Sequence, residues 1–185
     1  MRTQRAGQSA LLFVDVVEIL QQENIGYASI GAFALSAHGV VRGSTEVHAL
    51  LFTTPERLTR LRTLFDRAGL RTELRRGDAD DPIPAMLVVH DGYNNRVDLL
   101  GGLRGMDPAA SSRTVNVAFM DVDLRIIGRE DFIAMKCFAG DPQDILDAQS
   151  ALDSAQGPLD VDLLRAVTRR FGRDAADKLE QVLAR

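Results

Sequence analysis

Apolar residues recur in the first part of the chain at the spacing of amphipathic helices. Residues 9–23 carry them three and four positions apart, and Ser9 stands where a polar side chain would cap the helix N-terminus. A second helix is predicted over residues 53–69, where a glycine closes it. Between the two, the small residues of 31–39 predict a short third helix. The intervals between these helices have the length of strands.

Runs of aliphatic and β-branched residues bounded by turn residues predict those strands. They cover residues 27–31, 45–52, 70–77, 85–91, 96–102, 114–120 and 122–128. From residue 129 onward the pattern is helical, in the segments 129–139, 142–155, 159–171 and 173–184. This order predicts an α/β (α+β) fold, a mixed β-sheet flanked by helices with a C-terminal helical part. We expect an α/β core over 1–128 and a helical region over 129–185 packed on it.

The composition is typical of one globular domain. The chain has 185 residues, of which 45% are hydrophobic, and a formal net charge of −4. This mild acidity gives no overall electrostatic sign of nucleic-acid binding. Asp15 and Glu18 interrupt the apolar run near the N-terminus, which is too short to span a membrane. The single cysteine, Cys137, excludes an intramolecular disulfide. We therefore expect a cytoplasmic protein without membrane contact.

Two side chains of one predicted strand are candidates for chemistry. Glu46 and His48 are two positions apart in the strand 45–52, so both project from the same face. A carboxylate and an imidazole directed at one point are typical of a metal site. The same pattern also fits two polar residues on the solvent-facing side of a sheet. The residues alone leave both interpretations open.

The sequence around this strand has a recognisable order of small residues. In YASIGAFALSAHGVVRGSTEVHALLFTTPERL, a strand ends in a glycine motif, a short helix ends in His-Gly, and an Arg and a Thr precede the polar strand. The matching positions are Gly31, Ala32, His38, Gly39, Arg42 and Thr45. This stretch resembles the opening of the stand-alone nucleotidyltransferases of the abortive-infection toxin (AbiEii-like) type. In that family an Asp-x-Asp pair follows, and here Glu46 and His48 occupy its two positions.

Two later segments extend the resemblance to about residues 10–155. RVDLL supplies Asp98 where the family has its third carboxylate. REDFIAMKCFAGDPQDILDAQSAL supplies Lys136, Asp144 and Asp147 where the family has a lysine on a helix followed by an Asp-x-x-Asp region. The resemblance implies a catalytic and metal-binding group. Its members are Glu46, His48 and Asp98, with Lys136 added for catalysis.

The resemblance also implies a ligand, a metal and partners. Nucleotide binding would fall to Gly31, Ala32, Arg42, Thr45, Lys136, Asp144 and Asp147. A nucleoside triphosphate would be substrate or ligand, with Mg²⁺ or Mn²⁺ as the metal. The acceptor of the nucleoside monophosphate would be RNA (tRNA), a protein or a small molecule. A toxin–antitoxin role with an antitoxin partner follows from the same resemblance.

The residues at the centre depart from what magnesium chemistry selects. Magnesium requires hard oxygen ligands in a tight octahedron, and imidazole suits other metals better. Glu46 is one methylene longer than the aspartate of the family, and His48 removes a negative charge. One interpretation is an altered site that still transfers nucleotides through one metal or through manganese. The other is a non-catalytic module that binds a nucleotide or another partner. An antibiotic-type small-molecule nucleotidyltransferase is a further alternative.

Three other features carry two interpretations each. Gly31 could leave backbone N–H groups open to a phosphate, or merely allow close packing of strand and helix. Lys136 could contact a triphosphate, or extend to solvent from a partly buried helix. Asp121 and Asp123 form a second Asp-x-Asp. They are expected to lie at a hairpin turn rather than in a site, because Asp is a common turn residue.

Overall fold

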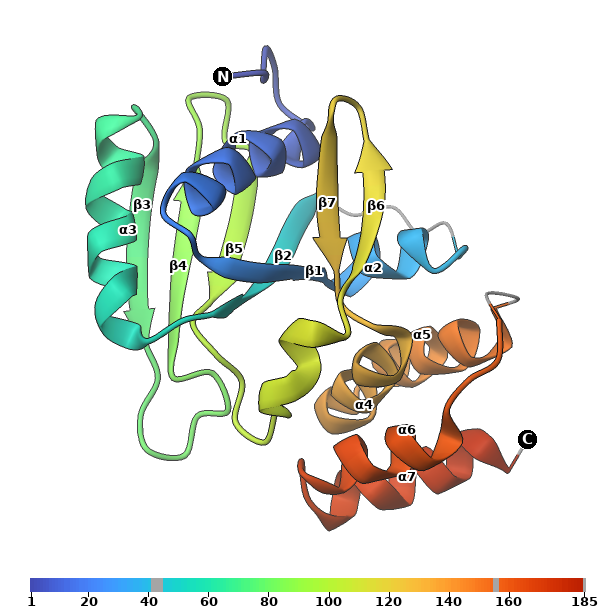
Figure 1. The fold of residues 1–185 in the computed structure, drawn as a ribbon. Coiled ribbons are helices and arrows are strands. Elements are labelled where there is room, and N and C mark those ends of the chain that lie inside the picture. The colour runs from blue at the N-terminus through green and yellow to red at the C-terminus, as the bar shows by residue number, and fades with distance from the viewer. Residues whose placement is uncertain (41–44, 155–156, 185) are drawn as a thin grey trace.

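The computed structural model describes residues 1–40, 45–154 and 157–184. The strands are β1 (Gly26–Ile30), β2 (Glu46–Phe52), β3 (Arg71–Arg76), β4 (Ala85–His90), β5 (Arg96–Leu100), β6 (Val115–Phe119) and β7 (Val122–Ile126). The helices are α1 (Ser9–Gln22), α2 (Gly31–Ala37), α3 (Pro55–Arg67), α4 (Arg129–Ala139), α5 (Pro142–Asp153), α6 (Val161–Arg169) and α7 (Arg173–Leu183), with the 3₁₀ helix η1 (Pro108–Ser112). The predicted α/β fold with C-terminal helices is confirmed (Figure 1).

The strands form one mixed sheet in the order β3-β4-β5-β2-β1-β7-β6. The central pair is β2 with β5, which are parallel and aligned so that Glu46 lies opposite Arg96 and His48 opposite Asp98. Strand β1 pairs with β2 antiparallel and with β7 parallel. Because this register is fixed over five residue pairs, it decides which side chains of β2 and β5 share a face.

Helices cover the sheet and bury a continuous core. Helix α1 packs on β2 and β5, and α3 packs on β3 and β4, which buries the aliphatic residues of these strands. Helix α4 packs against α5, α6 and α7, and the four helices are grouped together in Figure 1. Cys137 is fully buried in α4, and burial raises the pKa of its thiol to about 11. An inert thiol follows, since the thiolate is the reactive form.

One predicted helix cap is wrong. Gln8 is the N-cap of α1, and Ser9 is the first helical residue. The Ser9 hydroxyl donates to the carbonyl oxygen of Thr45 at 2.6 Å and accepts from the backbone N–H of Arg96 at 3.1 Å. Thr45 directly precedes β2 and Arg96 begins β5, so this hydroxyl joins the starts of the two strands instead of capping its own helix.

The second Asp-x-Asp lies at a turn, as predicted. Strand β6 ends at Phe119 and β7 begins at Val122, with Asp121 between them. The Asp121 carboxylate pairs with Arg2 at 3.4 Å, and Asp123 is exposed on β7. Among the described helices, none combines the length and apolar character that crossing a membrane requires.

Candidate functional site

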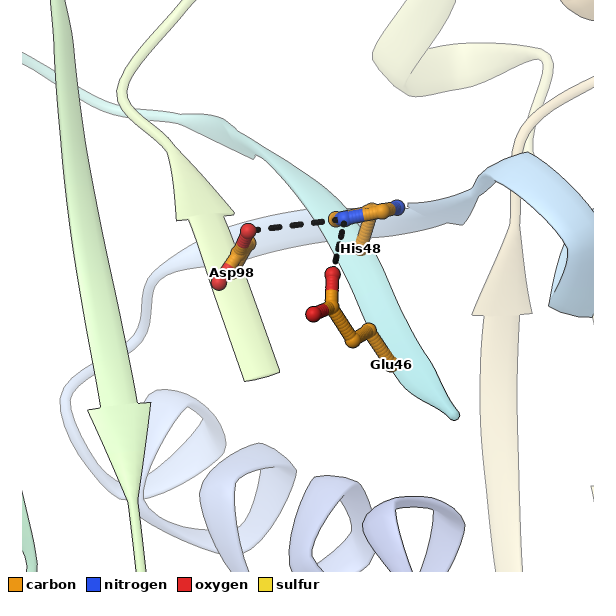
Figure 2. A group of neighbouring side chains, drawn as sticks. All are labelled: Glu46, His48 and Asp98. Carbon is orange, nitrogen blue, oxygen red and sulfur yellow. Dashed lines mark ion pairs between the residues drawn. The ribbon is translucent and has the colours of Figure 1, made fainter. Parts of the chain in front are cut away.

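Three polar side chains converge where β2 and β5 run side by side. The register places Glu46 and His48 of β2 on the same face as Asp98 of β5 (Figure 2). The His48 Nε2 atom lies 3.6 Å from Glu46 Oε2 and 3.4 Å from Asp98 Oδ2. One ligand atom from each of the three residues lies within 4.8 Å of the other two. The structure therefore brings together the three side chains that the sequence proposed as metal ligands.

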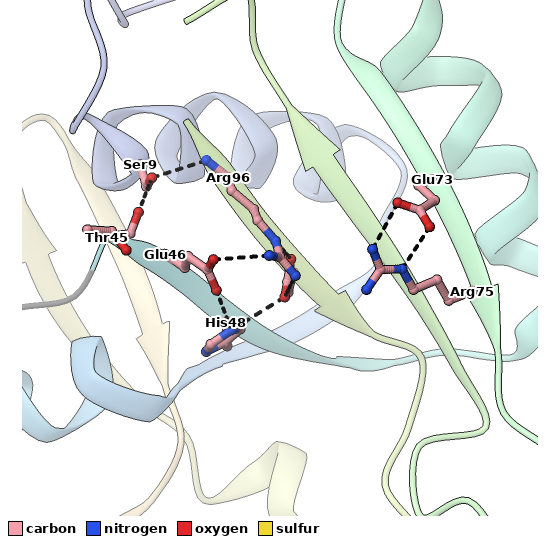
Figure 3. Close-up of polar contacts among 8 residues, drawn as sticks. Ser9, Thr45, Glu46, His48, Glu73, Arg75 and Arg96 are labelled. Atoms are coloured by element: carbon pink, nitrogen blue, oxygen red, sulfur yellow. Dashed lines mark hydrogen bonds and ion pairs between the residues drawn. The ribbon is translucent and has the colours of Figure 1, made fainter. Parts of the chain in front are cut away.

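An arginine that the sequence reasoning missed joins this group. The Arg96 side chain lies between the two carboxylates (Figure 3). Its Nε and Nη2 donate to the two oxygens of Asp98 at 2.7 and 2.8 Å, and its Nη1 donates to Glu46 Oε1 at 3.0 Å. Arg96 stands two residues before Asp98 on the same strand, so the two-residue period that paired Glu46 with His48 also predicts this contact.

The environment of Asp98 favours its charged form. The side chain is only 5% exposed, and burial on its own raises a carboxyl pKa. Hydrogen bonds from His48 and Arg96, together with the positive charge of Arg96, outweigh this effect, so the pKa of Asp98 is lowered below its ordinary value. Asp98 is thus a buried carboxylate that depends on its two partners.

This lowered pKa predicts an acid-dependent loss of stability. A carboxylate with a lowered folded-state pKa stabilises the fold above its unfolded pKa of about 4, and loses that contribution as the pH falls through the folded value. We expect Asp98→Asn to be destabilising at neutral pH. The difference from wild type should shrink as the pH falls below 4. Urea unfolding of both proteins at neutral and acidic pH measures it. A difference that does not change with pH would contradict this assignment.

The glycine motif lies beside His48. Gly31 begins α2 with φ +68°, and a Cβ atom there would lie 3.4 Å from His48 Nδ1. Ala32 follows on α2, and the Thr45 side chain is exposed before β2. Arg42 lies outside the described residues. The distance between the Cβ position of Gly31 and His48 Nδ1 is ordinary contact, so the positive φ is what favours glycine at this position. Its roles in packing and toward a nucleotide stay predictions.

Lys136 lies on α4 and is held by two aspartates of α5. Its Nζ atom is 2.6 Å from Asp144 Oδ1 and 2.8 Å from Asp147 Oδ2. Asp147 is buried, and Gln143 donates to its other oxygen at 3.0 Å. The Nζ atom also lies 5.7 Å from the centre of the Phe132 ring. The ammonium is therefore partly buried and paired, which rules out the solvent-extended interpretation of this lysine.

Lys136 lines a cleft of about 420 Å³ together with residues of β2 and β5. The polar residues of its lining are His48, Asp98, Lys136 and Asp144. The remaining wall is mostly apolar. It consists of Ile30, Pro82, Ile83, Met86, Leu100, Leu103, Phe132, Met135, Phe138 and Ala139, with Gly31 at the rim. Apolar walls with a few polar groups are typical of small-molecule sites.

Comparison of the fold gives matches that comparison of the sequence does not. No protein-family model matches the chain, and no curated protein matches its sequence. The solution structure of the antibiotic-resistance factor ANT(2'')-Ia covers 98% of this chain and 99% of its own, with a TM-score of 0.64 and 13% identity. The fold is that of nucleotidyltransferases. The prediction of this fold from the sequence is confirmed, and the abortive-infection type stays a prediction.

Two further nucleotidyltransferase-like structures agree. The lincosamide antibiotic adenylyltransferase LnuA, in its lincomycin-bound crystal structure, covers 83% of this chain and 100% of its own, with a TM-score of 0.52 and 8% identity. A nucleotidyltransferase-like protein from Paracoccidioides brasiliensis covers 97% of this chain and 93% of its own, with a TM-score of 0.54 and 13% identity. At these identities the likeness concerns the fold.

The metal pair that nucleotidyl transfer uses does not fit the residues present. Two magnesium ions need several carboxylates to neutralise and ligate them. Among the described residues, the group holds two carboxylates and an imidazole, and both carboxylates are hydrogen-bonded to Arg96. A single cation that accepts nitrogen, such as Mn²⁺, suits the Glu, His and Asp donors once the arginine is displaced.

Proposed function

We propose that this protein binds a small amphipathic molecule with an amine group in the cleft between β5 and α4, without two-metal nucleotidyl transfer. The observation that carries the proposal is the cleft itself, with its mostly apolar lining and the carboxylates of Asp98 and Asp144. Such a cavity matches a ligand with an apolar body, because the hydrophobic contacts supply affinity and the polar groups fix orientation.

Carboxylates in the lining of the cleft favour an amine as ligand. Asp98 and Asp144 both line the cleft, together with Lys136. The ammonium of Lys136 is already paired with Asp144 and Asp147. An amine would be attracted by the lining carboxylates, whereas a triphosphate would be repelled by them.

Two structural neighbours were solved with small molecules. One was solved in complex with adenylyl-2''-tobramycin and another bound to lincomycin. A small-molecule ligand for this chain agrees with the mostly apolar cleft. Our proposal for this chain is that it retains the small-molecule half of the site and has lost the metal-binding half.

A second candidate function is adenylyl-type transfer through one metal. The three ligand atoms of Glu46, His48 and Asp98 within 4.8 Å favour it, since such a group can hold one cation. The transfer of a nucleoside monophosphate to RNA or to a protein, and a toxin–antitoxin role, stay predictions from the sequence resemblance. They share this metal requirement.

Calorimetry with lincomycin and tobramycin tests the main proposal. We expect at least one of them to bind wild type in buffer without metal. Met135→Arg should weaken that binding at least about tenfold, because it adds bulk and a positive charge to the cleft. Met120→Arg is the matched control, since Met120 is exposed on the β6–β7 turn, and it should bind as wild type does.

Two results would contradict the proposal. The first is tight binding of ATP without metal together with no binding of either amine compound. The second is equal loss of binding in Met135→Arg and Met120→Arg. Transfer of labelled nucleotide from ATP to tobramycin in the presence of Mn²⁺ would establish the second candidate instead.

A further inference from the structure

We propose that the Arg96 guanidinium is a resident cation of the β2–β5 site, and that a divalent ion binds Glu46, His48 and Asp98 only by displacing it. This inference deepens the proposed function. It rests on that proposal in one respect, which is that the site works without metal. It concerns a group that contains a buried charge, because the Asp98 side chain is 5% exposed.

The geometry places the guanidinium where a shared cation would bind. Its three hydrogen bonds reach both oxygens of Asp98 and one oxygen of Glu46, at 2.7 to 3.0 Å. The contact with Asp98 is bidentate, the arrangement in which an arginine binds a carboxylate most strongly. Asp98 Oδ2 accepts from Arg96 and also faces His48 Nε2 at 3.4 Å, so a metal ion held between Asp98 and His48 competes with the guanidinium for this oxygen.

The competition favours the arginine because its displacement has two costs. A buried carboxylate that loses its guanidinium partner must be fully compensated by the incoming ion. The released guanidinium, 28% exposed at its side chain, stays attached to β5 and keeps its positive charge near the metal. Repulsion between two such charges weakens metal binding further.

Among the residues that the structure describes, His48 and Arg75 are charged or ionisable groups near Arg96, and neither replaces its role. His48 of β2 approaches Asp98 at 3.4 Å, but it bears a charge only when protonated. Arg75 of β3 makes its own bidentate pair with Glu73 at 2.8 and 3.0 Å (Figure 3). Arg75 is therefore a matched control, because it is an arginine in a bidentate pair on the same sheet, outside the group of three.

The test measures metal binding by the protein alone. Electron paramagnetic resonance measures how much Mn²⁺ stays free in the presence of each protein. The proteins are wild type, Arg96→Gln, Arg96→Lys and Arg75→Gln. We expect Arg96→Gln to bind Mn²⁺ at least about tenfold more tightly than wild type. Arg96→Lys, which retains the charge, should stay within about threefold of wild type. Arg75→Gln should be unchanged.

Two outcomes would overturn the inference. One is a wild type that binds Mn²⁺ as tightly as Arg96→Gln. The other is an Arg96→Lys variant that gains as much affinity as Arg96→Gln, because the positive charge would then be irrelevant. Failure of the small-molecule proposal would appear in calorimetry with lincomycin and tobramycin, which is a separate measurement.

A measurement on wild type covers the case in which the glutamine variant does not fold. The Arg96 Nε–H group, hydrogen-bonded to Asp98, should give a slowly exchanging ¹⁵N resonance. We expect addition of Mg²⁺ or Zn²⁺ to leave this resonance in place. Stoichiometric metal binding that leaves this resonance unchanged would overturn the inference, because the ion would then bind without displacing the arginine.

Discussion

Replacing Asp131 by alanine is expected to destabilise the protein by about 1.5–3 kcal/mol, because it removes the charged hydrogen bonds from Arg113 and leaves that arginine with Asp107 alone. Asp131 is 2% exposed at its side chain and accepts two hydrogen bonds from Arg113, both at 2.7 Å. The arginine follows η1 and the aspartate lies in the first turn of α4. This pair therefore joins the segment before β6 to the helix that carries Lys136.

Urea unfolding of Asp131→Ala measures this loss. The matched control is Glu180→Ala, which removes an equally bidentate contact with Arg165 at 2.8 and 2.9 Å on the exposed surface of α6 and α7. Exposed ion pairs contribute little, so the control should unfold close to wild type. Equal losses in the two variants would mean that burial does not determine the contribution of these pairs.

Much of the fold follows from local patterns in the sequence. The helix predicted over 129–139 has the same bounds as α4, and the other predicted elements agree with the structure to within a few residues. Periodicity reports which residues share a face of one element, and turn residues mark where it ends. Ser9 was misplaced because its hydroxyl bonds to Thr45 and to Arg96, which are distant in the sequence.

The composition of the site was only half predictable. Glu46 and His48 lie on one strand, so their convergence follows from a period of two. Asp98 came from the resemblance, and its approach to His48 depends on the β2–β5 register. Arg96 was missed because the same period was not applied to β5. Its contact with Glu46, across the two strands, has no local signal at all.

The charge around Lys136 is another property that the sequence could not predict. The resemblance named Lys136, Asp144 and Asp147 together as nucleotide-binding residues, and the structure has both carboxylates within 2.8 Å of the Lys136 Nζ atom. The sequence did not show that this pairing neutralises the lysine toward a triphosphate. The charge that matters to a ligand is the sum over neighbours, which only the assembled fold determines.

Restoring the two aspartates, Glu46→Asp with His48→Asp, is expected to create magnesium binding that wild type lacks. The change replaces an imidazole by a hard oxygen ligand, adds a negative charge and shortens the other carboxylate by one methylene. We expect the double variant to bind Mg²⁺ at least about tenfold more tightly than wild type in calorimetry. Adding Arg96→Gln to it should strengthen binding further, because the resident cation is then gone.

The control for the restored site is His48→Asn with Glu46→Asp, which matches the shape of the double variant without its added charge. This control should bind Mg²⁺ no better than wild type, since amide oxygen is a weaker ligand than carboxylate for this ion. If wild type already binds two Mg²⁺ ions tightly, the residues at positions 46 and 48 do not weaken the centre. In that case, the one-metal and metal-free interpretations would both be wrong. A gain that appears only when Arg96→Gln is present would instead show that the arginine, more than the imidazole, keeps magnesium out of this fold.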